Sequence, residues 1–214
     1  MSCCGSENCG IGRFFSRFSG RYARRYERKG LESTQKQLLA GLQVAGIKGK
    51  SLLEIGCGVG YLHQSLLSMG AGSAVGVDLS ASMLKEAEIR AARLGLSGRT
   101  RYQQGDFREI APEMEGADVT LLDKVVCCYP DAEGLLAATT AHTKDLCALT
   151  LPRGHWVNRV GARVMTAFLR LLGSTYRPFV HDPQAVDAWI RAAGFGKISE
   201  AHTAFWLTRV YQRL

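Results

Sequence analysis

The stretch SLLEIGCGVGYL, at residues 51–62, places three glycines at alternate positions, shortly after an acidic side chain. The glycines are Gly56, Gly58 and Gly60, and the acidic residue is Glu54. Glycine-rich turns allow the backbone to approach a bound molecule closely, and several cofactors are held in this way. The neighbouring residues therefore decide which ligand the loop serves.

Two common phosphate-binding loops do not match this sequence. A dinucleotide-binding fingerprint needs G-x-G-x-x-G, and its third glycine position is occupied by Tyr61. A P-loop needs Lys followed by Ser or Thr after its glycines, and the continuation GYLHQS has no such pair. The remaining interpretation is a nucleoside ligand that carries positive charge and no pyrophosphate, because Glu54 stands at the end of a predicted strand.

The segments around the loop alternate between short apolar runs and helical patterns, which is typical of βαβ units around a parallel sheet. We predict strands at 51–55, 74–78, 100–103, 118–122 and 145–151, with crossover helices at 61–68, 81–94 and 132–143. A last helix begins after Asp182 as its N-cap and ends at Gly194. The stretches 197–205 and 206–214 then read as an antiparallel pair of strands.

Acidic residues recur where these strands end, and Asp78 could accept hydrogen bonds from both hydroxyls of a ribose. The run Glu54-Ile55-Gly56-Cys57-Gly58-Val59-Gly60 resembles the first motif of the class I S-adenosylmethionine-dependent methyltransferases, an acidic residue followed by G-x-G-x-G. The later segments AVGVDLS, QQGDF and ADVTLLDKVVCCYPD fit the family pattern in order.

The resemblance implies S-adenosylmethionine as the cofactor and an α/β fold, a Rossmann-like seven-stranded sheet with a terminal antiparallel strand pair. It covers residues 49–214, whereas residues 1–48 are predicted as a cysteine-containing tail and a helical cap. Asp106 would face the adenine amino group, with Phe107 against the ring. The cofactor-binding residues implied are Glu54, Gly56, Gly58, Gly60, Asp78, Leu79, Asp106, Phe107, Asp123 and Lys124.

Transfer of the sulfonium methyl is an in-line displacement, so the acceptor decides which further residues matter. A carboxylate or thiolate needs no base, whereas a phenol or amine must lose a proton at the site. The resemblance places the acceptor near the loop after the fourth strand, the segment before the last helix and the N-terminal cap. Our catalytic candidates are Cys128, Tyr129 and His181, with packing of Cys127 and Cys128 as small apolar residues as the alternative.

Apolar residues at helical spacing on a polar background predict two amphipathic helices between Arg13 and Ala45, broken near Gly30. A second stripe, Trp156, Val160, Val164, Phe168 and Leu172, indicates another helix, acting as a lid over the pocket or as ordinary core. With the motif CYP after the fourth strand, these segments look similar to magnesium-protoporphyrin O-methyltransferases, which esterify a tetrapyrrole propionate. The start SCCGSENC does not belong to that pattern.

The formal net charge of +8 and the early run of arginines suit an anionic substrate, RNA or a solvated helix face. We expect a small-molecule acceptor and no nucleic acid, because the N/D-P-P-Y/F motif of base-amino methyltransferases is missing; an RNA methyltransferase is the alternative. Cys3, Cys4 and Cys9 could bind a soft metal ion, which would make the chain a metal-binding protein with a methyltransferase fold. The alternative is an unliganded tail, and we assign no metal.

The chain has no run of about 18 apolar residues and no secretory signal, so we expect a cytoplasmic protein with reduced thiols and no membrane span. The acceptor molecule and the oligomeric state are left open by the sequence.

Overall fold

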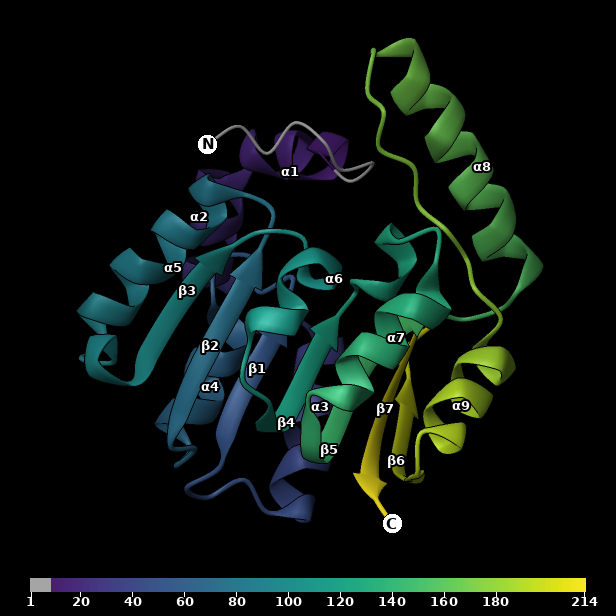
Figure 1. Cartoon of the computed structure of the whole chain (residues 1–214). Coiled ribbons are helices and arrows are strands. Elements are labelled where there is room, and N and C mark those ends of the chain that lie inside the picture. The colour runs from purple at the N-terminus through teal and green to yellow at the C-terminus, as the bar shows by residue number, and fades with distance from the viewer. Residues whose placement is uncertain (1–8) are drawn as a thin grey trace.

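The computed structural model describes residues 9–214, in which helices cover both faces of a seven-stranded sheet (Figure 1). The strand order is β3-β2-β1-β4-β5-β7-β6. The parallel strands are β1 (Ser51–Ile55), β2 (Ser73–Asp78), β3 (Thr100–Gln104), β4 (Ala117–Asp123) and β5 (Thr143–Pro152). β7 (Trp206–Arg213) pairs antiparallel with β5 and with β6 (Phe195–His202). The predicted Rossmann-like sheet and its antiparallel end are confirmed.

The crossover helices lie where the sequence predicts them. They are α4 (Tyr61–Ser68), α5 (Ala81–Arg93) and α7 (Ala132–Ala141), with a short α6 (Phe107–Ile110) after β3. α7 ends before the predicted Thr143 because that residue already pairs with Ala117 as the first residue of β5. α9 (Pro183–Ala192) begins after Asp182, whose carboxylate accepts a hydrogen bond from the Gln184 N–H at 2.9 Å.

The N-terminal region forms three helices rather than the predicted two: α1 (Cys9–Ser16), α2 (Ser19–Lys29) and α3 (Ser33–Ala45). The break at Gly30 is confirmed, and a second break falls at residues 17–18. The end of α1 is held against the start of α5, since the Ser16 hydroxyl lies 2.7 Å from that of Ser80 and also donates to the Gly12 carbonyl. The aromatic spacing continues through this break, so periodicity alone does not reveal it.

The core has two halves because neighbouring residues of each strand point to opposite faces of the sheet. On one face, Leu52 and Leu121 pack against α3 and α4. On the other face, Leu53 and Leu122 pack against α7 and α9. Leu38 and Leu42 of α3 are fully buried, so the third N-terminal helix shares the core of the sheet although it precedes the predicted methyltransferase domain.

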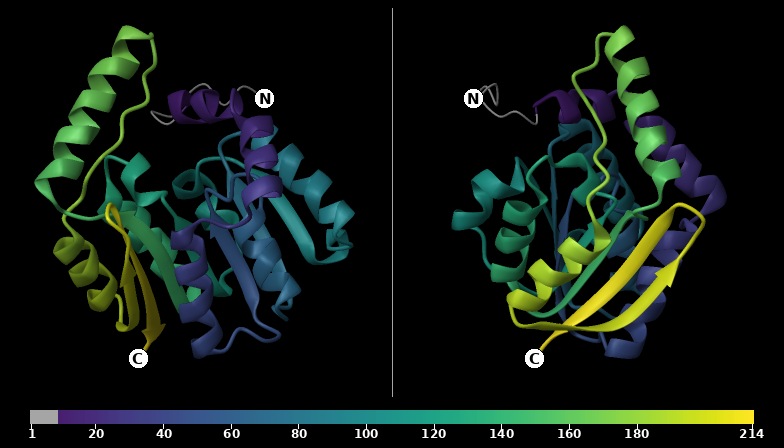
Figure 2. Two further views of the ribbon diagram at one scale, coloured as in Figure 1. Left: turned by 180° about the vertical axis from the view of Figure 1, so that it is seen from behind. Right: turned by 90° about the vertical axis from the view of Figure 1, so that its right-hand side faces the viewer.

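A long helix, α8 (Trp156–Leu171), follows β5 and projects beyond the carboxyl edge of the parallel strands (Figures 1 and 2). The helix is confirmed, but its predicted apolar stripe is exposed, so the interpretation of that stripe as ordinary core is wrong. A different side of α8, with Val157, Gly161 and Met165, lines a cavity.

Among residues 9–214, no helix is long and apolar enough to cross a membrane. Cys3 and Cys4 lie outside the described residues, as does the side chain of Cys9, so the suggested soft-metal site is not described.

Candidate active site

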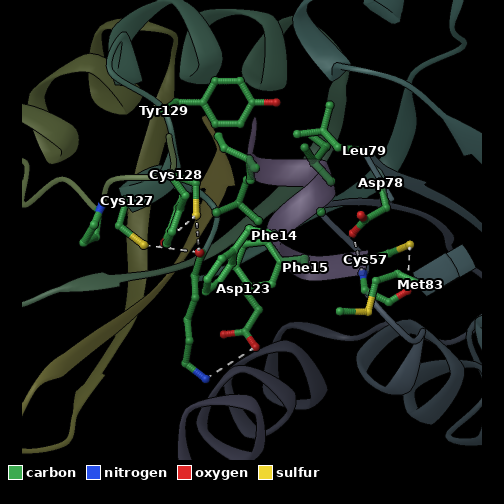
Figure 3. A pocket seen from close by; sticks show the side chains of 18 of the residues that line it. Phe14, Phe15, Cys57, Asp78, Leu79, Met83, Asp123, Cys127, Cys128 and Tyr129 are labelled. Atoms are coloured by element: carbon green, nitrogen blue, oxygen red, sulfur yellow. Dashed lines mark hydrogen bonds and ion pairs between the residues drawn. The ribbon is translucent and has the colours of Figure 1, made fainter. Parts of the chain in front are cut away.

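A cavity of about 850 Å³ opens at the carboxyl ends of β1, β2 and β4, between α1, α2 and α8. This is the edge at which open α/β sheets bind their ligands. The glycine loop and the acidic strand ends form one side, and aromatic and aliphatic side chains form the other. Figure 3 shows Cys127, Cys128 and Tyr129 on one side of this cavity and Cys57, Asp78 and Leu79 on the other.

The glycine loop is tied to Asp78. The Gly58 N–H donates to Oδ2 of Asp78 at 2.8 Å, and the Ser80 N–H donates to Oδ1 at 2.9 Å. Burial raises the pKa of Asp78 to about 6, although both backbone hydrogen bonds oppose this rise. A carboxylate held at the cavity wall in this way can accept further hydrogen bonds from a pair of vicinal hydroxyls.

Gly58 and Gly60 of the loop are required for different steric reasons. Gly58 has φ +52°, and a side chain there would meet nothing within 4 Å, because the position faces the cavity. Gly60 has φ +79°, and a Cβ there would lie 2.9 Å from that of Ala87 and 2.6 Å from the Gln64 amide nitrogen. Gly58 therefore keeps space for a ligand, whereas Gly60 allows α4 and α5 to approach each other.

Glu54 is buried and paired within the protein. Its Oε2 accepts a hydrogen bond from the His63 N–H at 3.1 Å and lies 2.5 Å from the His63 ring Nδ1. The other ring nitrogen of His63 lies 3.0 Å from the Tyr102 hydroxyl. Burial raises the pKa of Glu54, and the His63 contacts oppose that rise. Sequence reasoning missed His63, because its pairing depends on how α4 crosses the end of β1.

The predicted adenine end of the site is joined to the loop after β4. Asp106 is the N-cap of α6, and its Oδ1 accepts hydrogen bonds from the Arg108 N–H at 3.1 Å and the Tyr129 hydroxyl at 2.9 Å. Burial, reinforced by the neighbouring Asp106 carboxylate, raises the pKa of Tyr129. The phenol of Tyr129 thus remains protonated and holds Asp106, although we predicted it on the acceptor side. Phe107 is buried and lines the cavity.

Two charged residues, Asp123 and Lys124, lie at the end of β4, and the backbone of Lys124 is strained. The Asp123 side chain is 8% exposed; its Oδ2 accepts a hydrogen bond from the Gln35 amide at 2.9 Å, while its Oδ1 has no hydrogen-bond partner among the described residues. Burial raises the pKa of Asp123, against the attraction of Lys124. Lys124 has φ +60°, in the left-handed region that costs a residue with a side chain free energy, and its ammonium pairs with Glu32. Strain and an unsatisfied buried oxygen at one strand end indicate a ligand site.

The helices of the cap complete this end of the cavity. The Gln35 amide also donates to the Tyr26 hydroxyl at 2.8 Å, and the Tyr26 ring stacks on Tyr61 with centroids 4.5 Å apart. Phe14 of α1 stacks on Tyr176, with centroids 5.0 Å apart. Cap and insert thereby meet across the cavity.

The cysteine pair lies in a 3₁₀ turn at Val126–Cys128. The Cys128 thiol lies 3.6 Å from the Tyr176 hydroxyl, and both thiols face the Lys124 carbonyl. The pKa of Cys128 is lowered, chiefly because the Cys127 thiol donates toward it, while the same contact raises the pKa of Cys127. His181 instead points its Nε2 to the Tyr129 carbonyl at 2.9 Å, and it does not line the cavity.

Most of the predicted site residues are brought together, and their roles stay predictions. Ten line the cavity: Glu54, Gly56, Gly58, Asp78, Leu79, Phe107, Asp123, Lys124, Cys128 and Tyr129. Gly60 and Asp106 lie outside the lining shell, as His181 does. The N-terminal helices and the segment before the last helix, both predicted to surround the acceptor, do line the cavity. The side chains that they contribute were not predicted individually and include Phe14, Phe15, Tyr22, Tyr26, Gln35, Met165 and Tyr176.

Comparisons with known proteins agree with this geometry. Residues 52–145 match the family model of a methyltransferase domain. The chain is 29% identical over 156 residues to the ubiquinone biosynthesis O-methyltransferase of Hahella chejuensis and 28% identical over 157 residues to that of Pseudomonas aeruginosa strain LESB58. Each match covers 70% of this chain and 64% or 66% of the relative, just under two thirds of its length.

Solved structures resemble the whole fold. The magnesium protoporphyrin IX methyltransferase of Synechocystis PCC 6803 with bound S-adenosylhomocysteine has a TM-score of 0.72 at 18% identity, covering 95% of this chain and 98% of the other. Its form with S-adenosylmethionine has a TM-score of 0.73 at 15% identity, covering 100% of both chains.

The fold and the glycine loop with its acidic strand ends are characteristic of class I S-adenosylmethionine-dependent methyltransferases. Residues 52–145, which match the methyltransferase domain, contain this loop and the acidic ends of β1, β2 and β4, and the two solved structures that share the fold hold S-adenosylhomocysteine or S-adenosylmethionine.

Proposed function

We propose that the chain transfers the methyl group of S-adenosylmethionine to an ionised carboxylate on a small, flat and largely apolar acceptor. The observation that carries this proposal is the lining of the cavity. It is rich in aromatic and aliphatic side chains, and none of its lining residues within the described chain is a histidine. A carboxylate arrives ionised at neutral pH and needs no base, whereas a phenol needs one.

The residues of the glycine side would bind the cofactor. Asp78 and the Gly58 loop would hold the ribose, and the unpartnered Oδ1 of Asp123 would accept a hydrogen bond from the ammonium of the methionine part. When bound, the cofactor supplies an electrophilic methyl on a positively charged sulfur. Holding the acceptor oxygen behind this methyl group, in line with its bond to sulfur, accounts for much of the acceleration in such displacements.

The residues of the cap and insert would bind the acceptor. Phe14 and Tyr176 offer stacked rings, and Met165 of α8 adds an adaptable apolar wall. Aromatic faces at this spacing suit a planar ring system. The fold shared with the magnesium protoporphyrin IX methyltransferase supports a tetrapyrrole propionate as one acceptor of this class.

A phenolic acceptor is the second candidate, supported by the similarity to ubiquinone biosynthesis O-methyltransferases. The residue that would then remove the proton is Cys128, because it lines the cavity and the contact with Cys127 lowers the pKa of its thiol. The comparisons lend no support to an RNA methyltransferase or to a metal-binding protein.

The proposed setting is the cytoplasm. Seven cysteines are present, and the four whose side chains are described, Cys57, Cys127, Cys128 and Cys147, are free thiols. Such thiols suit a reducing compartment.

The test uses S-adenosylmethionine carrying a radioactive methyl group and a panel of planar carboxylates and polyprenyl catechols. Methylation of a carboxylate gives an ester, which releases labelled methanol in alkali, whereas methylation of a phenol gives an ether, which does not. We expect alkali-labile label, and turnover that survives Cys128→Ser within a few-fold. Alkali-stable label that is lost in Cys128→Ser would establish the second candidate instead.

A further inference from the structure

We propose that α8 and the arginine-bearing face around it bind the surface of an anionic lipid bilayer. The apolar face of α8, which we call the α8 stripe, consists of Trp156, Val160, Val164, Phe168 and Leu171. Their spacing places them along one side of the helix. Trp156 is 73% exposed, Val164 64% and Leu171 87%.

The α8 stripe is not needed for the cavity. The cavity side of the helix carries Asn158, Ala162, Met165 and Leu169, whereas Val164, Phe168 and Leu171 do not line it. Within residues 9–214 no other segment buries the stripe. A contiguous apolar face left in water is unfavourable and marks an interaction surface.

The charge beside the stripe identifies the partner. Residues 146–181 contain no Asp or Glu and carry Arg153, Arg159, Arg163, Arg170 and Arg177. Arg159, Arg163 and Arg170 share one flank of α8 at helical spacing and are exposed. A helix with an apolar face, a tryptophan and a basic flank is the pattern of helices that lie in a membrane interface without crossing it.

The same edge of the molecule carries a second basic surface. Residues 9–26 also contain no Asp or Glu, and their arginines include Arg13, Arg17, Arg21 and Arg24, which are exposed. Figure 1 shows α1 and α8 beyond the same edge of the sheet. Basic residues near an anionic bilayer each strengthen binding roughly fivefold.

A second cavity lies where these two surfaces meet. It has a volume of about 520 Å³, and its lining includes Arg13, Arg17, Phe18, Leu169 and Leu172. Guanidinium groups beside aliphatic and aromatic side chains suit an amphiphile with an anionic head.

Other occupants fit less well. Pairing of two α8 stripes about a two-fold axis would repeat the same basic flank at one interface and bring like charges together. An RNA would contact the arginines and leave the aliphatic stripe in water. The lipid surface satisfies both the apolar and the basic part.

The two helices that bear these surfaces also line the large cavity, through Ile11 and Phe14 of α1 and Val157 and Met165 of α8. An apolar acceptor dissolved in the bilayer would then enter without crossing water. That consequence rests on the proposed function, whereas bilayer binding does not, and the experiment below measures binding without cofactor or acceptor.

The experiment measures flotation of the full chain with phosphatidylcholine vesicles, with and without phosphatidylglycerol. We expect binding to the anionic vesicles that weakens as salt rises. Val164→Gln/Leu171→Gln should reduce vesicle affinity by about tenfold or more while S-adenosylhomocysteine affinity is retained. Arg163→Gln/Arg170→Gln should reduce the affinity for anionic vesicles roughly fivefold for each arginine and leave the affinity for phosphatidylcholine vesicles unchanged.

The matched control is Val44→Gln/Leu94→Gln, which alters residues 92% and 47% exposed at the opposite edge of the sheet and should bind vesicles like the wild type. Vesicles should also shift tryptophan emission to shorter wavelength, and Trp156→Phe should abolish the shift. Absence of wild-type binding, or equal losses in the control, would overturn the proposal. A wild-type dimer that Val164→Gln/Leu171→Gln dissociates, with no vesicle effect, would assign the stripe to a second copy instead.

Discussion

The phenol of Tyr129 donates a hydrogen bond to Oδ1 of Asp106 over 2.9 Å and so connects the loop after β4 to the start of α6. Asp106 is predicted at the adenine end of the cofactor, and Tyr129 is predicted beside the acceptor. This hydrogen bond fixes the two side chains relative to each other. We therefore predict that Tyr129 positions Asp106 for the cofactor and does not exchange protons with the acceptor.

We expect Tyr129→Phe to weaken S-adenosylhomocysteine binding about fivefold, since one hydrogen bond contributes about 1 kcal/mol. In kinetics the KM for S-adenosylmethionine should rise while kcat changes little. Titration calorimetry and initial rates measure the two effects. Tyr176→Phe is the matched control, because Tyr176 contacts Cys128 and should alter the KM of the acceptor only. A large loss of kcat with unchanged cofactor affinity in Tyr129→Phe would contradict the assignment.

Cofactor affinity should depend on the protonation of Asp78, whose pKa is about 6 because of burial. Above pH 7 the carboxylate is ionised and can accept hydrogen bonds from both ribose hydroxyls. As the pH falls through about 6, affinity for S-adenosylhomocysteine should decline, approaching tenfold per pH unit. Calorimetry between pH 5 and pH 8 measures this dependence, and in Asp78→Asn affinity should be low and show no such decline. A flat profile in the wild type would remove Asp78 from the ribose site.

Asp78 also makes the free energy of unfolding depend on pH, but in the opposite direction to cofactor affinity. Its folded-state pKa lies above the ordinary value of 3.8, so the folded protein binds more protons than the unfolded chain between these values. The contribution of Asp78 to the free energy of unfolding is therefore favourable below pH 4 and is lost as the pH rises through about 6. The loss is on the order of 3 kcal/mol. Urea unfolding at both ends of this window, in wild type and Asp78→Asn, isolates the contribution.

Gly58 and Gly60 should separate binding from stability. Gly58→Ala costs about 1 to 2 kcal/mol of left-handed strain, and it should weaken S-adenosylhomocysteine binding about tenfold because its methyl group enters the cavity. Gly60→Ala adds overpacking against Ala87, about 1 to 3 kcal/mol more. Denaturant unfolding and calorimetry distinguish the two variants. Unchanged binding in Gly58→Ala would show that the loop does not face the cofactor.

Asp123 is predicted to accept the ammonium of the cofactor through its unpartnered Oδ1. Asp123→Asn should therefore weaken S-adenosylhomocysteine by about 1.5 to 3 kcal/mol, the range for a hydrogen bond to a charged group. It should leave 5′-methylthioadenosine unaffected, since that ligand lacks the amino-acid part. Competition calorimetry with both ligands measures the difference. Equal losses for both would place Asp123 away from the ammonium.

Much of the cofactor side was readable from the sequence because its signals are local. The apolar runs that form β1 and β4, the three alternate glycines and the acid at the end of β2 each lie within a few residues of one another. Parallel strands bring their carboxyl ends to one edge, so correct strands suffice to gather Glu54, Asp78 and Asp123 there.

The contacts that join distant segments were decided by the tertiary structure. Gln35 reaches Asp123 across 88 positions, and Tyr26 stacks on Tyr61 only because α2 crosses the start of α4. The α8 stripe shows the limit most clearly. Its periodicity establishes an apolar side of a helix, but whether core, cavity or solvent faces that side depends on how the helix docks. That docking angle is set by packing with elements far away in the chain, and no local pattern encodes it.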